Sequence, residues 1–184
     1  RNPFSGSWPD FFTDNDINAL IEAWGAETRL FGDARDLITG AAYRDILLGA
    51  GGDDELRGWK GADRVEGGLG NDQVMGGDGA DDLLGGAGDD SIFGGYGHDT
   101  ITGGSGNDRI RGGFGRDLFV WSSGFDLIED FRLSENDRIG LQSGIGYELH
   151  QQGDDLQLIS SLGVTTLLNV DLGGFSAIDH MVAL

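Results

Sequence analysis

Apolar residues recur at intervals of nine along half of this 184-residue chain, from residue 31 to residue 120. The eighth position of each of ten consecutive units is apolar, and no unit is out of register. The series is Ile38, Leu47, Leu56, Val65, Val74, Leu83, Ile92, Ile101, Ile110 and Phe119. A short fixed period with one apolar position per unit predicts a solenoid, in which stacked units bury a continuous core that no unit buries alone.

The other fixed positions of the unit define its turn. Glycine fills position one in nine units and position four in eight, and aspartate fills position six in all ten. Glycine adopts positive φ without steric cost, so glycines in fixed phase indicate ordered turns rather than a flexible linker. The pattern G-G-x-G-x-D-x-U-x predicts an all-β fold, a parallel β-roll. We expect a six-residue turn and a three-residue strand in each unit, and two units in each coil.

Two units per coil sort the aspartates into two columns, in which neighbours are about 4.8 Å apart. Neighbouring carboxylates repel each other by on the order of 1 kcal/mol even at the dielectric constant of water. A thin apolar core must offset this repulsion and the ordering entropy of the glycines. We therefore expect the metal-free chain to be largely unfolded. One column holds Asp36, Asp54, Asp72, Asp90 and Asp108, and the other holds Asp45, Asp63, Asp81, Asp99 and Asp117.

A hard divalent cation between adjacent turns would reverse this balance, because it brings positive charge to the carboxylates and takes oxygen ligands from both turns. Calcium fits best, since it accepts six to eight oxygens in flexible geometry, whereas magnesium demands a tight octahedron. Zinc and copper prefer nitrogen or sulfur, which the repeat does not offer. The alternative, a glycine-rich solenoid with solvated aspartates and no metal, leaves the acid at position six unexplained.

The overall composition narrows the classes of partner. The formal net charge is −20, from 32 acidic and 12 basic residues, so neither nucleic acid nor insertion into an anionic membrane is expected. Cysteine is absent, which excludes disulfides, and no apolar run reaches transmembrane length. The first residues contain neither an initiator methionine nor the apolar core of a signal peptide. We expect a fragment or processed product, with a further domain upstream.

Residues 31–120 resemble the RTX family, the hemolysin-type calcium-binding repeats of proteins exported by bacterial type I secretion. The eight units from Gly49 onward are close to the family consensus. The resemblance implies a right-handed β-roll with calcium between turns on the same side. The implied ligands are the aspartates of both turns, the carbonyls of positions two and four of one turn, and those of positions one and three of the next. Six sites follow, and Asp36 and Asp45 would add two, so we expect six to eight ions.

The same resemblance assigns ligands residue by residue. One implied site joins Gly68, Gly70 and Asp72 with Gly85, Ala87 and Asp90; another joins Gly77, Gly79 and Asp81 with Gly94, Tyr96 and Asp99. The turn residues implied at the sites are Gly49, Gly51, Gly52, Gly58, Trp59, Lys60, Gly61, Gly67, Gly68, Leu69, Gly70, Gly76, Gly77, Asp78, Gly79, Gly85, Gly86, Ala87, Gly88, Gly94, Gly95, Tyr96, Gly97, Gly103, Ser105, Gly112 and Phe114. Phe31, Ala34, Ala41 and Tyr43 depart from the pattern in the first two units.

The segments on either side of the repeats lack the nine-residue pattern and predict other structures. In residues 1–30 we expect a loop and a capping helix from Thr13 to Trp24, whose apolar residues recur at helical spacing. The spacing of Asp14, Asp16 and Asn18 also suits an EF-hand loop, but the glycine and glutamate that such a loop needs are missing.

In residues 121–184 the β-rich runs 147–151, 156–160 and 164–170 predict an antiparallel cap that covers the edge of the last coil. The stretch from Asp126 to Phe131 resembles a segment that follows the repeats in serralysin-type proteases and mannuronan epimerases. There an aspartate can close the last site, which implies this role for Asp126 and a structural role for Asp130. The C-terminal residues 179–184 resemble the hydrophobic end of a type I secretion signal.

No catalytic motif occurs in the sequence, and we expect no enzyme activity from this chain. His98, His150 and His180 fit surface or structural roles. Acidic pairs such as Asp89 and Asp90 suggest glycosidase chemistry only superficially, because adjacent side chains point in different directions. Tyr96 and Phe114 are 18 residues apart, so they share one face, where packing between coils is favoured over stacking on sugar rings.

Three hypotheses follow. The favoured one is a calcium-binding domain of a type I secreted bacterial protein, extracellular or at the cell surface, which the secretion apparatus exports unfolded and which folds on calcium outside. The second is a calcium-dependent module that binds extracellular polysaccharide. The third is the tail of a secreted hydrolase, lyase or adhesin whose active domain lies upstream.

Overall fold

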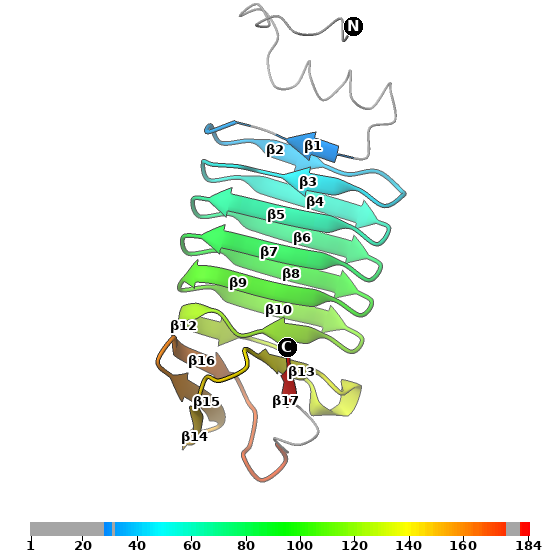
Figure 1. Ribbon diagram of the computed structural model, residues 1–184. Coiled ribbons are helices and arrows are strands. Elements are labelled where there is room, and N and C mark those ends of the chain that lie inside the picture. Colours follow the sequence, from blue (N-terminus) through cyan, green and yellow to red (C-terminus); the bar gives the residue numbers. More distant parts are fainter. Residues whose placement is uncertain (1–27, 31, 176–180) are drawn as a thin grey trace, which may run out of the picture.

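The computed structural model describes residues 28–30, 32–175 and 181–184, and they form a β-roll that is closed at its C-terminal end by a small sheet (Figure 1). The strands are β1 (Thr28–Leu30), β2 (Leu37–Thr39), β3 (Ile46–Leu48), β4 (Glu55–Lys60), β5 (Arg64–Leu69), β6 (Gln73–Asp78), β7 (Asp82–Ala87), β8 (Ser91–Tyr96), β9 (Thr100–Gly106), β10 (Arg109–Phe114), β11 (Leu118–Val120), β12 (Ser123–Ile128), β13 (Arg138–Leu141), β14 (Tyr147–Gln152), β15 (Asp155–Ser160), β16 (Gly163–Leu167) and β17 (Met181–Ala183).

Successive strands alternate between two walls, and every strand of the roll pairs in parallel with the strand two places further along. The first wall contains β2, β4, β6, β8, β10 and β12, and the second contains β1, β3, β5, β7, β9, β11 and β13. The register is 18 residues, as when Val65 pairs with Leu83 and Leu83 pairs with Ile101. The predicted coil of two units, and with it the all-β parallel roll, is confirmed.

The core is a ladder built from position eight of the units. The ten apolar side chains at this position, from Ile38 to Phe119, are at most 3% exposed. Each of these residues pairs with the position-eight residue of the adjacent coil, as Leu83 does with Val65 and Ile101, so the apolar side chains form a continuous stack. Because each unit adds one such side chain, the core is long and narrow.

The central strands are longer than the three residues that the pattern predicts. They run for six residues, or seven in β9, because the ladder continues into positions two and three, where Trp59 pairs with Gly77 and Lys60 pairs with Asp78. The first part of the predicted turn is therefore a strand, and only three residues separate β4 from β5. Glycines permit this extension because they have no Cβ atom, so the backbone carbonyls of the adjacent coil can approach them closely.

The parallel stacking also extends past Val120, where the glycine pattern ends. Strand β12 continues the first wall over β10, and β13 continues the second wall over β11. Beyond them, β14, β15 and β16 form the predicted antiparallel meander, and β16 lies against β12. Strand β17 lies against β13, so the C-terminal residues Met181–Ala183 are part of the fold. Both walls of the roll thus have their last edge covered.

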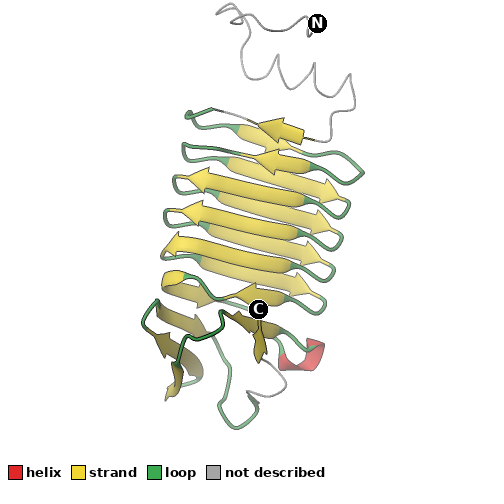
Figure 2. Cartoon of the chain, in the orientation of Figure 1, coloured by secondary structure: helices red, strands yellow, loops and turns green. Residues whose placement is uncertain are grey.

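Helix contributes almost nothing to the part of the chain that the structure describes. Its one helical element is the 3-10 turn η1 (Leu133–Glu135), drawn in red in Figure 2. In the same residues no helix is long and apolar enough to cross a membrane. The predicted capping helix at Thr13–Trp24, its EF-hand alternative and His180 lie outside the described residues.

Candidate metal centre

The position-six aspartates form two buried ladders in which each carboxylate reaches back to the preceding coil. Asp72 Oδ1 accepts a hydrogen bond from the backbone N–H of Asp54, and Asp90 Oδ1 accepts one from Asp72, both at 2.8 Å. The second column repeats this contact, for example from the N–H of Asp63 to Asp81 Oδ1 at 2.8 Å. All ten aspartates are at most 7% exposed. The sequence therefore places them correctly in two columns.

The second oxygen of most of these carboxylates is buried without a partner. In the part of the chain that the structure describes, Oδ2 has no hydrogen bond in Asp54, Asp63, Asp72, Asp81, Asp90, Asp99, Asp108 and Asp117. A buried polar atom without a partner costs about 1–3 kcal/mol, and more when it is charged. Eight such atoms at one position of a repeat indicate a ligand that the protein chain does not itself provide.

Glycine at position one makes room beside this oxygen. A Cβ atom at Gly67 would lie 2.4 Å from Asp72 Oδ2, and a Cβ atom at Gly85 would lie 2.3 Å from Asp90 Oδ2. Neither distance is possible for a real side chain. The free oxygen therefore faces bare backbone at position one, which explains why glycine fills this position in nine of ten units.

Burial raises the pKa of the repeat aspartates from Asp54 to Asp117 in the protein without metal. Burial raises the pKa of Asp90 and Asp99 to about 7, against the lowering effect of the N–H groups that they accept from. Neighbouring carboxylates of the same column raise the pKa further, Asp108 and Asp72 in the case of Asp90. Burial also raises the pKa of Asp81 to about 6. A cation that binds Asp90 or Asp99 near neutral pH would therefore compete with a proton for the carboxylate.

Backbone carbonyls line the gaps between the turns. The carbonyl oxygen of Gly61 points so closely at Gly79 that a Cβ atom there would lie 1.4 Å from it, and Gly70 and Gly88 show the same approach at 1.9 Å. Of the implied ligands at position three, the Ala87 carbonyl accepts a hydrogen bond from Gly70 at 2.8 Å. A carbonyl oxygen has two lone pairs, so this contact leaves one for a metal.

The donor set in each gap suits calcium. Among the described residues, no group of three or more His, Cys, Asp or Glu side chains is arranged so that it could hold a metal ion by itself. Each gap instead offers two carboxylates, from Asp72 and Asp90 for example, and surrounding backbone carbonyls. Calcium accepts such a mixed set of oxygens, whereas structural zinc sites need nitrogen or sulfur. The residues present therefore fit the calcium that the sequence pattern predicts.

The first two units depart from this arrangement, as their sequence suggests. Asp36 donates its backbone N–H to Asp54 Oδ1, and Asp45 donates its own to Asp63 Oδ1, both at 2.8 Å. Asp45 Oδ2, however, accepts a hydrogen bond from the N–H of Ala41 at 2.6 Å. Its second oxygen thus has a partner within the chain, unlike those of the regular units.

Two turns hold a side chain where the pattern has glycine. Ala50 and Trp59 stand at position two and adopt positive φ, of 71° and 76°. Such a conformation is unfavourable for residues with a Cβ atom. The turn geometry is thus imposed by the stacking of the coils on both sides, and it does not depend on glycine at every position two.

A third ladder of side chains, at position five, was not expected from the sequence. The N–H of Asn71 donates to Asp53 Oδ1, that of Asp89 to Asn71 Oδ1 and that of Asn107 to Asp89 Oδ1, each at 2.8 Å. In the second column His98 Nδ1 accepts from the N–H of Arg116 at 2.9 Å. In an acidic pair such as Asp89 and Asp90, the first residue thus belongs to the position-five ladder and the second to the buried position-six ladder. His98 makes a structural contact with the backbone of the next coil.

Two aspartates continue the columns beyond the repeats. Asp126 Oδ1 accepts from the N–H of Asp108 at 3.3 Å, and its Oδ2 accepts from the Ser122 hydroxyl at 3.1 Å. Asp137, which sequence analysis missed, accepts from the N–H of Asp117 at 2.9 Å. The signal for Asp137 is the apolar residue two places on, Ile139, which pairs with Phe119.

Tyr96 and Phe114 lie face to face on the surface, with ring centroids 5.1 Å apart and planes 10° apart. The guanidinium of Arg132 covers Phe114 at 5.1 Å from its centroid. One face of the Tyr96 ring and the ring of Phe114 therefore contact other residues of the protein, as expected for packing between coils.

Comparison with known proteins identifies the repeats. The family model described as the RTX calcium-binding nonapeptide repeat (4 copies) matches residues 32–65, 39–74, 60–92, 84–119 and 93–128. Together these matches run without a break from residue 32 to residue 128. No curated protein matches the chain.

Matches among solved structures include one lipase and two subunits of one epimerase. Extracellular lipase LipA from Serratia marcescens is 20% identical, with a TM-score of 0.40, over 84% of this chain and 41% of the lipase. The AlgE6R2 subunit of the Azotobacter vinelandii mannuronan C5-epimerase is 23% identical, with a TM-score of 0.42, over 60% of this chain and 91% of the subunit. The AlgE6R3 subunit is 24% identical, with a TM-score of 0.35, over 84% and 82%.

Proposed function

Because the chain belongs to the family of RTX calcium-binding nonapeptide repeats, we propose that it is the calcium-dependent folding domain of a secreted bacterial protein. The observation that carries this proposal is the set of eight buried Oδ2 atoms without a partner, which stand in two columns on the two sides of the roll. A cation in each gap would satisfy these atoms and cancel the repulsion within the columns.

The chain's own residues would divide the work at each gap. The later aspartate, such as Asp90, keeps its Oδ1 on the preceding coil and presents Oδ2 to the gap. The earlier aspartate, Asp72, supplies the second carboxylate, and carbonyls of positions one to four complete the set. Calcium supplies the positive charge that allows both acids to be ionised. On this scheme the regular units hold six ions, and the units of Asp36 and Asp45 add up to two.

Metal binding and folding would be one process in this domain. The core gains one fully buried side chain per unit, while each unit must order several glycines and bury an acid. Without a cation these costs oppose folding. With a cation they are offset, because the binding site exists only in the folded chain and the free energy of binding therefore adds to the free energy of folding. Export by a type I apparatus in the unfolded state, followed by folding in millimolar calcium outside the cell, is the physiological setting that we propose.

Circular dichroism tests this proposal directly. In chelator at neutral pH the chain should give a disordered spectrum, and calcium should convert it cooperatively to a β spectrum that chelator reverses. Magnesium at the same concentration should not replace calcium, because it binds in a tighter geometry and retains its waters. A chain that is fully folded in excess chelator would rule out the folding function, whether or not it binds calcium.

A groove on the first wall favours a second candidate function, the binding of extracellular polysaccharide. It has a volume of about 380 Å³ and is lined by Trp59 of β4, Met75 of β6 and Phe93 of β8, with charged side chains beside them. The side chains of Trp59 and Phe93 are 58% and 44% exposed. Aromatic faces next to polar groups suit a sugar ring, which has an apolar face and a polar rim.

A glycan-binding assay with and without chelator distinguishes the two functions. Saccharide binding that needs calcium and falls in Trp59→Ala, but not in Phe125→Ala, would support the second candidate. Phe125 is the matched control, because it is an exposed aromatic residue outside the groove. Calcium-dependent folding without saccharide binding would leave only the first.

A further inference from the structure

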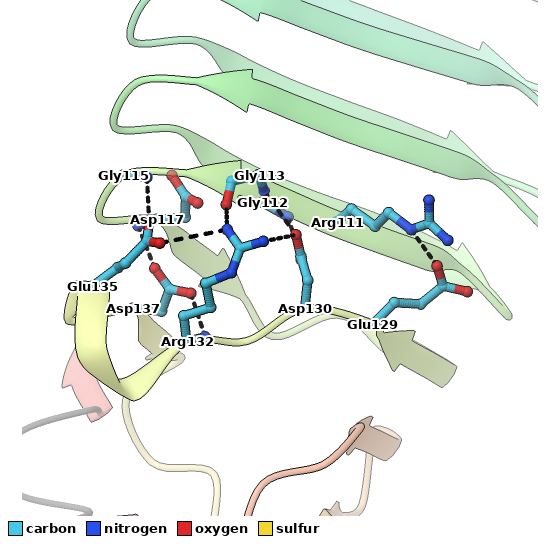
Figure 3. A network of polar contacts seen from close by, with 10 residues as sticks. All are labelled: Arg111, Gly112, Gly113, Gly115, Asp117, Glu129, Asp130, Arg132, Glu135 and Asp137. Atoms are coloured by element: carbon cyan, nitrogen blue, oxygen red, sulfur yellow. Dashed lines mark hydrogen bonds and ion pairs between the residues drawn. The ribbon is translucent and has the colours of Figure 1, made fainter.

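The last turn of the second column, residues 112–117, is capped by three acidic side chains (Figure 3). Asp130 accepts hydrogen bonds from the N–H groups of Gly112 and Gly113, at 2.8 and 3.0 Å. Glu135 accepts one from Gly115 at 2.6 Å, and Asp137 accepts one from Asp117 at 2.9 Å. Four backbone N–H groups of this turn, those of Gly112, Gly113, Gly115 and Asp117, are therefore met by carboxylates.

Earlier turns use backbone carbonyls in the corresponding places. The first residue of a unit donates to a carbonyl 17 residues later, as Gly40 does to Arg57 and Gly49 does to Glu66. Position four does the same, as Gly97 donates to the Phe114 carbonyl at 2.8 Å. Asp130 and Glu135 replace two such carbonyls, so the end of an already acidic column carries additional negative charge.

One side chain brings positive charge into this gap. The guanidinium of Arg132 donates to the carbonyl of Gly113 and lies 3.8 Å from Asp130 and 3.6 Å from Glu135. Figure 3 shows it enclosed between these three groups. Gly113 stands at position two, where the carbonyl of a regular unit is the implied ligand for the next calcium.

Asp137 also lacks the free Oδ2 atom that the aspartates of the regular units have. The later aspartate of the gap is Asp137, and its Oδ2 accepts a hydrogen bond from the backbone N–H of Arg132 at 2.7 Å. In the regular gaps, from Asp54 to Asp117, this oxygen has no partner. Arg132 thus occupies the gap twice, with its backbone N–H on the carboxylate and its side chain on the carbonyl.

The first column ends differently. The later aspartate of its last gap, Asp126, has its Oδ2 on the hydroxyl of Ser122, and a hydroxyl can rotate away where a backbone N–H cannot. None of the ion pairs found among the described residues involves Asp108 or Asp126. This gap contains two acids and no built-in cation.

We propose that Arg132 takes the place of a calcium ion in the gap between Asp117 and Asp137, so that the second column closes without metal while the gap between Asp108 and Asp126 remains a calcium site. The proposal rests on the calcium-binding function argued above. A guanidinium stays charged at every physiological pH and has five donors, which suits a gap rich in carboxylates. The C-terminal end of the roll then offers a surface on which calcium-dependent coils can stack.

Native mass spectrometry of the calcium-loaded chain tests this assignment by counting ions. Arg132→Gln keeps a donor for the Gly113 carbonyl but removes the charge, and it should bind one calcium ion more than the unaltered chain. Arg132→Lys keeps a cation and should bind the unaltered number. Arg111→Gln is the matched control, because Arg111 also pairs with an acid, Glu129, but on the outer face of the first wall. An unchanged ion count in Arg132→Gln overturns the proposal, even if stability falls.

Two further variants cover the case in which Arg132→Gln does not fold, and the same ion count by native mass spectrometry is the readout. Asp126→Asn should bind one calcium ion fewer than the unaltered chain, because the last gap of the first column is a calcium site. Asp137→Asn should bind the unaltered number, and the loss of an ion in this variant overturns the proposal. A chain that binds no calcium at all would refute the proposed function instead.

Discussion

Asp90 and Asp72 are joined by a hydrogen bond of 2.8 Å, from the backbone N–H of Asp72 to Asp90 Oδ1, and this arrangement leaves Asp90 Oδ2 buried without a partner. One oxygen thus fixes the register of the roll, and the other is left for a ligand. The same division of labour recurs from Asp54 to Asp117. Register and metal binding are therefore set by one residue per unit.

Asp90→Ala should disturb folding more than Asp117→Ala. Asp90 borders two regular gaps, with Asp72 and with Asp108, whereas one of the two gaps at Asp117 is closed by Arg132. We expect the calcium concentration at half-folding to rise by more than about tenfold in Asp90→Ala, equivalent to about 1.4 kcal/mol, and by less in Asp117→Ala. A calcium titration followed by circular dichroism measures both midpoints.

Asp89→Ala is the matched control for this pair. It removes the same charge from the adjacent position, but Asp89 is exposed and bonds to Asn107 in the outer ladder. Its midpoint should stay close to that of the unaltered chain. Equal shifts in Asp89→Ala and Asp90→Ala would show that net charge, and not ligation, determines the response.

Acid should partly replace calcium in the metal-free chain. Burial raises the pKa of Asp90, Asp99 and Asp126 to about 7 in the folded chain, from 3.8. Between these values the folded chain binds more protons than the unfolded chain, so the free energy of unfolding falls as the pH rises from about 4 to about 7. In chelator the β signal should therefore be larger at about pH 5 than at about pH 7.5.

Calcium should reverse this trend, because protons compete for the same oxygens. The calcium midpoint should increase as the pH falls through about 7, towards 4. Spectra in chelator that do not change between the two pH values would contradict the raised pKa values. Loss of β structure on acidification in chelator would contradict their sign.

The sequence alone predicts the parts of this molecule that repeat. Asp54 and Leu56 show why: both lie inside a fixed period, and the side chain of each meets an equivalent residue in the next coil. The position of such a residue in the nine-residue unit, and the number of the unit, predict whether it is buried and to which column it belongs. Trp59 departs from the pattern, yet its turn keeps positive φ because both neighbouring coils impose it.

The features that do not repeat could not be derived in this way. Asp137 stands 20 residues after Asp117 rather than 18, so an insertion removes it from the phase of the repeats. Asn71 belongs to a ladder at position five, where the residue type varies from unit to unit. Arg132 acts through contacts with Gly113 and Glu135 that only the folded turn brings together.

Leu83→Ala should show how much the narrow core contributes. Leu83 is fully buried between Val65 and Ile101, and the stacked coils leave little freedom to close a cavity. We expect a loss of about 2–5 kcal/mol in the free energy of unfolding, measured with urea in saturating calcium. Leu69→Ala is the control, because Leu69 is 66% exposed, and its effect should stay within about 0.5 kcal/mol. Similar losses in both variants would contradict the assignment of the core of the repeats to position eight.

Gly97→Ala should prevent regular stacking of the second column even in excess calcium. Gly97 has φ of 141°, and a Cβ atom there would lie 1.6 Å from the carbonyl oxygen of Gly79. Neither the conformation nor the contact can be relieved without separating two coils, so we expect a loss of more than about 4 kcal/mol.

Gly146→Ala is the matched control for Gly97→Ala, since no atom lies within 4 Å of a Cβ atom at Gly146. Its free energy of unfolding should change by less than about 0.5 kcal/mol. Urea unfolding in saturating calcium measures both variants. A Gly97→Ala chain as stable as Gly146→Ala would mean that the turns sit further apart in the calcium-loaded protein than the close carbonyl contacts of Gly79 and Gly97 require.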